Sequence, residues 1–280
     1  QRQMCIRDRF VSSGATLQVK ESNGSVRPWG DARANQIWKK PLAVMVDRYS
    51  ASASEIFAGA IQDYQRGVII GHKTFGKGTV QKLDDLSSGQ IKITESKFYR
   101  ITGSGMQSKG IQPDITLPTT WDIEQIGESS YNTALPWDEI KPVRFRKFSM
   151  KSSLINQLNN EHLKRVNQNP NLQYILDVRE RYDVQKNKKE ISLNLKKRKI
   201  EKEERQSWAL NIENKRRASL NLEIFSSYEA MKNYNDAKET DDDKKKYDID
   251  VDDDYLLNEG AQILSDYTAF SQNTLLSKAA

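Results

Sequence analysis

The residues whose types could do chemistry lie close together in the first third of the chain. A short apolar run, LAVMV at 42–46, is followed by serines alternating with alanines at 50–54. Apolar residues then recur at helical spacing over 53–65, which predicts a buried strand, a tight turn and a helix. A serine in that turn, Ser52, would expose its hydroxyl at a helix N-terminus, where the N–H of Ala53 and the helix dipole favour an oxyanion. This pattern is what acyl transfer by a serine nucleophile requires.

A serine hydroxyl also needs a base. The chain has only two histidines, His72 and His162, and neither lies in a pattern typical of a catalytic triad. Lys77 is the candidate, because enclosure by protein disfavours the charged form of a lysine and lowers its pKa. Small glycine neighbours allow the backbone to approach closely, and Gln81, four residues on, is placed to hold the amine through its amide oxygen. The sequence therefore predicts a Ser52–Lys77 pair.

Both residues also fit ordinary structural roles. Ser52 and Glu55 have the spacing of a helix capping box, and Lys77 fits an exposed lysine in a glycine-rich turn. The run GHKTFGK at 71–77 matches the first seven positions of a phosphate-binding loop. The eighth position, however, is Gly78, which lacks the hydroxyl that binds Mg²⁺, and the next residues favour a strand over the required helix. A helix cap, a turn lysine and a P-loop-like nucleotide site are the alternatives.

The surrounding pattern predicts an α/β core that positions these residues. Alternating or continuous apolar segments indicate strands, and Asn23-Gly24 indicates a hairpin turn. The predicted strands lie at 16–20, 42–46, 68–70, 79–83 and 90–100.

Composition sets further limits. The 280 residues are 36% hydrophobic with a mean hydropathy of −0.78, which favours one packed domain plus a long solvated part. The net charge of +6 is too small to indicate nucleic-acid binding by itself. Cys5 is the single cysteine, so no internal disulfide can form. The sequence contains no run of 18 apolar residues, so it predicts no membrane span.

The composition changes after residue 118. Residues 119–149 read as a connector, and residues 150–280 read as a mainly helical extension. Within it, 194–217 is dense in Lys, Arg and Glu and predicts a solvated helix, while the acidic segment 236–254 predicts a flexible loop. The charged, unpatterned residues 1–9 are expected to be a non-native leader.

Several runs resemble the carboxyl-terminal processing proteases, in particular their tail-specific branch. They are YSASASEIF at 49–57, TFGKGTVQ at 74–81, KGIQPD at 109–114 and ALPWD at 134–138. The resemblance implies that residues 10–118 are part of a crotonase- or ClpP-like βαβ spiral core. It also implies that the helical segment from 150 is the C-terminal extension of that branch.

By motif match, the resemblance assigns the nucleophile to Ser52, the general base to Lys77 and the lysine-orienting glutamine to Gln81. Asp63 and Thr74 match further positions that the family uses around its site. The implied activity is endoproteolysis, by an acyl-enzyme route without metal or cofactor, of proteins with apolar, unstructured C-termini. The implied location is the bacterial periplasm or cell envelope.

The resemblance also predicts parts that would lie before Phe10: a signal peptide, a PDZ-like tail-binding domain and a glycine-rich segment that lends an oxyanion N–H. The chain is therefore expected to be a fragment.

A different class of function is an interaction module, in which the charged helical half binds a partner such as an adaptor. Glutamates interleave with the basic residues at 194–217, which favours a solvated helix face over a nucleic-acid site.

Overall fold

The computed structural model describes residues 9–31, 36–148, 150, 152–244 and 254–276. The chain forms two compact units. Unit 1 comprises Gln1–Leu117, Asp122–Asn160 and Gly260–Ala280, and unit 2 comprises Pro118–Trp121 and Glu161–Glu259. The residues expected to be a connector therefore belong mostly to unit 1, and the residues expected to be a leader lie outside the described part except for Arg9.

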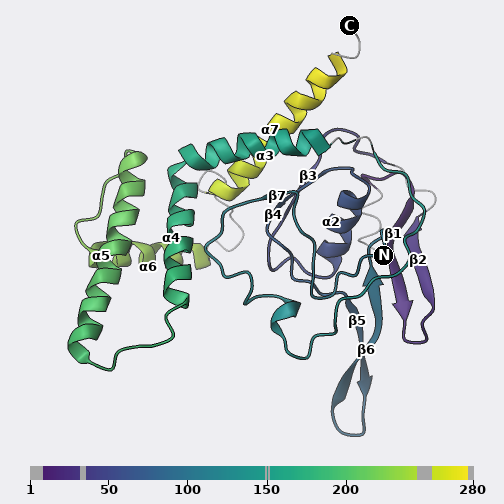
Figure 1. Cartoon of the computed structure of the whole chain (residues 1–280), viewed down its shortest axis with the longest axis horizontal. Helices are drawn as coiled ribbons and strands as arrows, with labels where there is room; N and C mark the ends of the chain where they lie inside the picture. The colour runs from purple at the N-terminus through teal and green to yellow at the C-terminus, as the bar shows by residue number, and fades with distance from the viewer. Residues whose placement is uncertain (1–8, 32–35, 149, 151, 245–253, 277–280) are drawn as a thin grey trace. The chain divides into compact units, whose positions relative to one another are not determined.

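A parallel sheet with strand order β3-β4-β7 lies at the centre of unit 1. Its strands are β3 (Ala43–Val46), β4 (Val68–Gly71) and β7 (Ile115–Thr116). Parallel neighbours require a crossover, and helix α2 (Ala53–Asp63) supplies it between β3 and β4 (Figure 1). All four residues of β4 are buried, as the continuous apolar sequence predicts.

An antiparallel sheet with strand order β2-β1-β6-β5 forms the second layer. It contains β1 (Gly14–Glu21), β2 (Val26–Asp31), β5 (Thr79–Asp85) and β6 (Gln90–Tyr99). The hairpin predicted at Asn23-Gly24 joins β1 to β2, and Gly24 has the positive φ of 84° that such a turn needs. The hairpin of β5 and β6 extends beyond the rest of this sheet (Figure 1).

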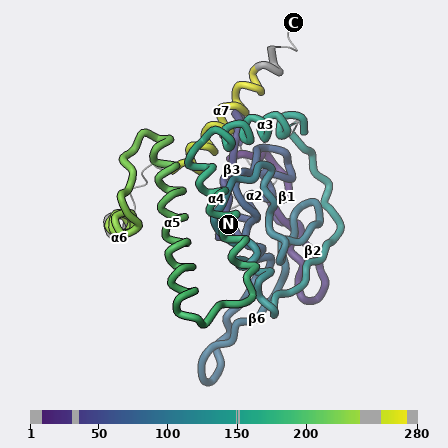
Figure 2. Tube along the Cα trace, turned by 60° about the vertical axis from the view of Figure 1, so that its left-hand side comes forward, coloured from purple at the N-terminus to yellow at the C-terminus, as the bar shows by residue number. Residues whose placement is uncertain are grey.

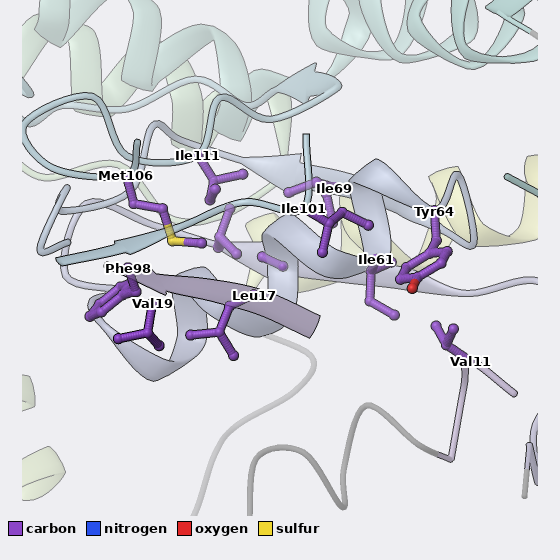
Figure 3. Close-up of a cluster of buried hydrophobic side chains, with 12 residues drawn as sticks. Val11, Leu17, Val19, Ile61, Tyr64, Ile69, Phe98, Ile101, Met106 and Ile111 are labelled. Carbon is purple, nitrogen blue, oxygen red and sulfur yellow. The ribbon is translucent and has the colours of Figure 1, made fainter. Parts of the chain in front are cut away.

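The core of unit 1 fills the space between the two sheets and α2 (Figure 3). Strand β1 contributes Leu17 and Val19, α2 contributes Ile61, β4 contributes Ile69 and β6 contributes Phe98. Ile61 and Ile69 are fully buried. Burial of one such side chain stabilises a fold by roughly 1.5–3 kcal/mol, so this cluster fixes α2, and with it the turn that precedes α2, against both sheets.

Unit 2 is helical (Figure 2). Its helices are α4 (Pro170–Lys186), α5 (Leu195–Ser219) and α6 (Tyr228–Lys244), and it shares α3 (Ser152–Gln168) and α7 (Tyr255–Leu276) with unit 1. Helix α4 begins where Asn169 accepts the Asn171 N–H at 2.9 Å, with Pro170 in the first turn. A small core of Val166, Leu172 and Ile175 packs against Tyr255 and Leu256. Among the described residues, no helix is both long and apolar enough to cross a membrane.

The α/β core followed by a helical extension is confirmed. The loop expected over 236–254 is wrong for residues 236–244, which continue α6. Once the first turn has formed at Tyr228, each added residue gains a hydrogen bond without a new nucleation cost, so a polar sequence can extend the helix. The rest of that segment, residues 245–253, lies outside the described residues.

Candidate active site

The backbone at Ser52 is strained in a way that suits a nucleophile. Ser52 precedes α2 with φ 56° and ψ −103°, a conformation that costs a residue other than glycine of the order of 1–3 kcal/mol. Sharp turns between a strand and a helix present a serine hydroxyl in the same manner. The Asp47 carboxylate braces the turn from the other side, accepting the Ser50 N–H at 2.8 Å and the Tyr49 N–H at 3.0 Å.

Glu55 joins two connections: residues 47–52, which we term the serine turn, and residues 72–78, which we term the lysine loop. Its carboxylate is fully buried and accepts four hydrogen bonds: from the Ser52 N–H at 2.7 Å, the Thr74 hydroxyl at 2.6 Å, the Gly76 N–H at 2.6 Å and the Lys77 N–H at 2.9 Å. Ser52 and Glu55 have the capping-box arrangement predicted from their spacing. The Glu55 carboxylate therefore holds the backbones of both the serine turn and the lysine loop.

The charge state of Glu55 follows from these contacts. Burial raises the pKa of its carboxyl above the ordinary value, while the hydrogen bonds from Thr74, Gly76, Ser52 and Lys77 oppose the rise. The Thr74 hydroxyl accepts the Ile111 N–H at 2.7 Å and so directs its own proton toward Glu55. Because all four partners donate, the ionised carboxylate is the form that satisfies the site.

The lysine loop approaches the core closely. Gly76 has φ +90°, and a Cβ at this position would lie 3.0 Å from the carbonyl carbon of Ser108. Glycine is therefore required both for the backbone conformation and for the space. Lys77, in the same loop, is half-buried and is separated from β5 only by Gly78.

Ser52, Lys77 and Gln81 line a common cavity of about 620 Å³. The remaining wall is mixed: apolar side chains such as Leu17 and Val19 of β1, Ile56 of α2 and Phe98 of β6 alternate with polar and charged ones, including Glu21, Lys92 and Glu95. Val80 and Gln81 are both among the residues that line the cavity, and the β5–β6 ladder has a register shift between them.

The other predicted residues have different positions. Ala53 is the first residue of α2, where a backbone N–H has no acceptor within the helix. Thr74 lies behind the site, bonded to Glu55. Asp63 does not line the cavity: it ends α2, about 16 Å along the axis from Ser52, and its carboxylate accepts the Arg100 Nε–H at 3.0 Å.

The alternatives meet contrary observations. Neither histidine is among the described residues that line the cavity: His72 contacts the Leu117 carbonyl oxygen at 2.9 Å, and His162 contacts Glu259 at 2.8 Å. A phosphate-binding loop requires free backbone N–H groups followed by a helix. Here the Gly76 and Lys77 N–H groups donate to Glu55, and a strand follows. Among the described residues, no group of His, Cys, Asp and Glu side chains could hold a metal ion.

Sequence reasoning recognised Glu55 only as a helix cap. Its bonds to Thr74, Gly76 and Lys77 span 19 to 22 residues. A contact between distant segments has no local sequence signal. The one indication is the acidic residue itself, since a glutamate on the face of a helix that packs into a core needs several donors.

Comparisons with known proteins agree with this architecture. Residues 2–117 match the model of peptidase family S41, and residues 121–269 match the model described as the C-terminal domain of tail specific protease. A tail-specific protease of Haemophilus influenzae is 34% identical over 96% of this chain and 38% of that protein. A carboxy-terminal-processing protease of Bartonella bacilliformis is 36% identical over 40% of this chain and 26% of that protein.

Among solved structures, the photosystem II D1 C-terminal processing protease is 36% identical, with a TM-score of 0.38 over 41% of this chain and 30% of that chain. The α/β unit therefore matches peptidase family S41. More narrowly, the chain belongs to the tail-specific protease family, and it spans 38% of the length of the H. influenzae relative.

Proposed function

We propose that this chain contributes the catalytic serine and lysine of a tail-specific serine endopeptidase. The observation that carries the proposal is the shared anchoring of the two residues: the Glu55 carboxylate accepts the backbone N–H of both Ser52 and Lys77, at 2.7 Å and 2.9 Å. Both residues line one cavity. Such fixed geometry is what lets a nucleophile and its base act together.

The reaction would proceed by acyl transfer. Ser52 Oγ would attack the scissile carbonyl carbon as its proton passes to the Lys77 amine, and the Ala53 N–H would stabilise the oxyanion. The C–N bond then breaks, and the lysine gives its proton to the departing amine. Water, giving a proton to the same amine, then attacks the acyl carbonyl carbon; the ester C–O bond breaks, and the lysine returns the proton to Ser52 Oγ. The amide oxygen of Gln81 would orient the amine by accepting a hydrogen bond from one of its N–H groups.

Substrates of this site would be polypeptides with apolar, unstructured C-termini. The apolar wall formed by Leu17, Val19, Ile56 and Phe98 supports this substrate class, because it would bury apolar side chains beside the reacting carbonyl. An extended substrate would form its hydrogen bonds through its backbone. The site would therefore select substrates by the apolar character of their side chains and not by one particular sequence.

The test compares Ser52→Ala and Lys77→Ala with the parent in the full natural chain, on a peptide with an apolar C-terminus. We expect both variants to lose at least about 10³-fold in kcat, as removal of a nucleophile or its base does elsewhere. His72→Ala is the comparison for a histidine base and should retain activity. Cleavage by Ser52→Ala at the parent rate, or loss of activity in His72→Ala alone, would refute the assignment.

The helical unit offers a place for an adaptor. The loop after α4 and the start of α5 expose four apolar side chains, with 70% of Ile191, 98% of Leu193, 68% of Leu195 and 54% of Ile200 accessible. Basic residues surround them, which suits a partner with apolar and acidic groups. Leu193→Ser should slow turnover of protein substrates in cells while peptide cleavage in vitro stays unchanged. Equal turnover in cells would count against an adaptor here.

The cellular setting that we propose is the bacterial periplasm or cell envelope. Membership of the tail-specific protease family supports it. Fractionation of cells that produce the natural protein provides the test, since recovery of the protein with cytoplasmic markers alone would exclude this location.

A further inference from the structure

Arg48 is a fully buried arginine close to the proposed site. It lies in the turn that leads to Ser52, and its side chain is 0% exposed. The guanidinium donates to backbone carbonyls from two distant segments: the Thr74 carbonyl in the lysine loop, and the Ile126 carbonyl at 2.5 Å. A third contact reaches the Ser129 hydroxyl at 3.3 Å. One side chain therefore ties the serine turn, the lysine loop and residues 126–129 together.

Residues 122–138, which we term the docking segment, belong to the matched C-terminal domain but pack within unit 1. The Glu128 N–H donates to the Phe75 carbonyl at 2.9 Å, and Tyr131 lies against the Phe75 ring at 6.5 Å between centroids. Gly127 has φ +108°, and a Cβ there would lie 2.5 Å from an Arg48 nitrogen and 2.7 Å from the Phe75 carbonyl oxygen. The segment thus fits closely over the lysine loop.

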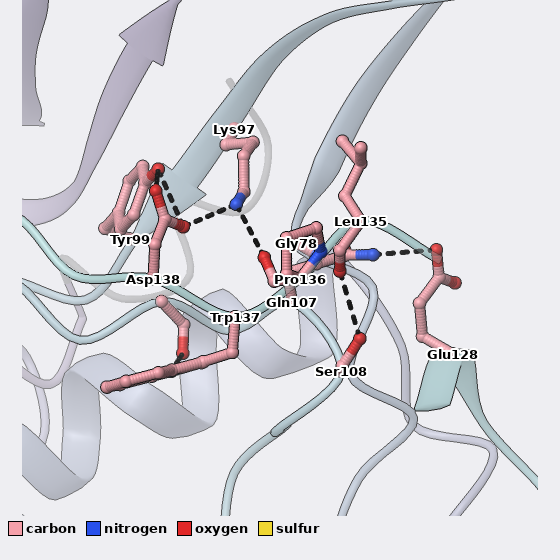
Figure 4. A network of polar contacts seen from close by, with 11 residues as sticks. Gly78, Lys97, Tyr99, Gln107, Ser108, Glu128, Leu135, Pro136, Trp137 and Asp138 are labelled. Atoms are coloured by element: carbon pink, nitrogen blue, oxygen red, sulfur yellow. Dashed lines mark hydrogen bonds and ion pairs between the residues drawn. The ribbon is translucent and has the colours of Figure 1, made fainter. Parts of the chain in front are cut away.

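A second link, drawn in Figure 4, reaches Gly78, the residue that follows Lys77. The Glu128 carboxylate accepts the Gln107 amide N–H at 3.1 Å, and the Gln107 amide oxygen accepts the Gly78 N–H at 2.9 Å. The lysine loop is therefore held at Thr74 and Phe75 on one side and at Gly78 on the other. Both attachments lead to residues 126–129 of the docking segment.

We infer that the docking segment is a working part of the catalytic site, and that Arg48 and Glu128 are positioning residues that fix Lys77 relative to Ser52. The inference rests on the proposed Ser–Lys function. The C-terminal domain would then control catalysis directly, because any movement of its first residues moves the base.

Arginine suits this role. Its planar guanidinium directs several N–H groups at once toward carbonyls on different segments, whereas a lysine offers one compact ammonium. Burial lowers the pKa of Arg48, and the charges of Glu124 and Glu55 oppose that change. A displacement of about 1 Å in a catalytic group can cost on the order of 10²-fold in rate, so small movements of the lysine loop have large effects.

The experiment compares Arg48→Lys and Glu128→Ala with the parent, in the full natural chain. Arg146→Lys and Glu139→Ala are matched controls, because both residues are exposed and lie near the docking segment. Glu128 is only partly buried, so Glu128→Ala should fold even if Arg48→Lys does not. We expect kcat to fall about 10- to 100-fold in both variants with KM changed less than about threefold. The controls should match the parent.

A double variant provides the readout that a merely structural role would not give. If Arg48 and Glu128 act through one lysine loop, the loss of kcat in Arg48→Lys with Glu128→Ala will be smaller than the product of the single losses. Parent-like kcat in Glu128→Ala, or multiplicative losses in folded variants, would overturn the inference. Ser52→Ala separates the two proposals: if it remains active, the Ser–Lys function itself has failed.

Discussion

Replacement of Glu55 by glutamine perturbs the junction between the serine turn and the lysine loop without changing its size. Glutamine has one acceptor oxygen, and its NH₂ group can only donate. In the parent, one carboxylate oxygen accepts from Thr74 and Gly76, and the other accepts from Ser52 and Lys77. Whichever way the amide is oriented, two donors lose their acceptor and face another donor.

The magnitude follows from those two bonds. A hydrogen bond to a charged group contributes about 1.5–3 kcal/mol, and the fully buried site offers no water to replace the two lost bonds. We therefore expect the free energy of unfolding of unit 1 to fall by about 3–6 kcal/mol. Release of the Ser52 or Lys77 backbone should also lower kcat about 10²-fold or more, since the proposed nucleophile and base would then lose their fixed separation.

Denaturant unfolding and steady-state peptide cleavage measure the two effects on the same preparation. Glu190→Gln is the matched control, because Glu190 is exposed in the loop between α4 and α5. It should leave both quantities unchanged. If Glu55→Gln keeps kcat within twofold of the parent while remaining folded, the Glu55 carboxylate does not position the pair, and the reasoning is refuted.

Three further outcomes follow from the rest of the structure. Ile61→Ala, at a fully buried position, should destabilise unit 1 by about 2–5 kcal/mol in denaturant unfolding, and a loss below 1 kcal/mol would show that α2 is not fixed by this core. Burial raises the pKa of Asp114, so the folded state binds its proton more tightly than the unfolded state. The contribution of Asp114 to the free energy of unfolding is complete below about pH 3.9 and declines as pH rises through the pKa of the folded state. Asp114→Asn should remove this slope from a profile of unfolding free energy against pH. The pKa shift of Glu259 has the opposite sign: burial desolvates the carboxyl and raises its pKa, but hydrogen bonds from His162 and Arg165 lower the pKa overall. Its contribution to the stability of unit 2 is present above about pH 4.3 and is lost in more acid solution. Hydrogen exchange should therefore show that the stability of unit 2 falls less on acidification in Glu259→Gln than in the parent.

The sequence predicted those parts of the site that depend on local order. A strand, a serine turn and a helix follow one another along 42–65, so alternating serines and periodic apolar residues were enough to place Ser52 before α2. The hairpin at Asn23-Gly24 and the start of α4 at Pro170 were predictable for the same reason. In each case the residues that determine the structure are neighbours in the chain.

Contacts between distant segments were not predictable in this way. Arg48 would read as an ordinary surface charge beside a turn, yet it is fully buried because carbonyls from Thr74 and Ile126 converge on it. The Glu128–Gln107–Gly78 link also spans three separate segments. Such bonds form only when the tertiary fold brings the segments together, and a single sequence contains no periodicity that reports them.

These distant contacts explain why the boundary between the sequence domains differs from the boundary between the compact units. The C-terminal domain match begins at residue 121, but residues 122–160 pack within unit 1 with the α/β core. Buried donors and acceptors impose this arrangement: without the docking segment, the Arg48 guanidinium would lose the Ile126 carbonyl, and Phe75 would lose the Glu128 N–H. An unpaired buried polar group costs about 1–3 kcal/mol, and a charged one costs more. The α/β core and the first part of the C-terminal domain therefore form one energetic unit. A cut at the sequence boundary would leave a buried charge beside the lysine loop without one of its partners.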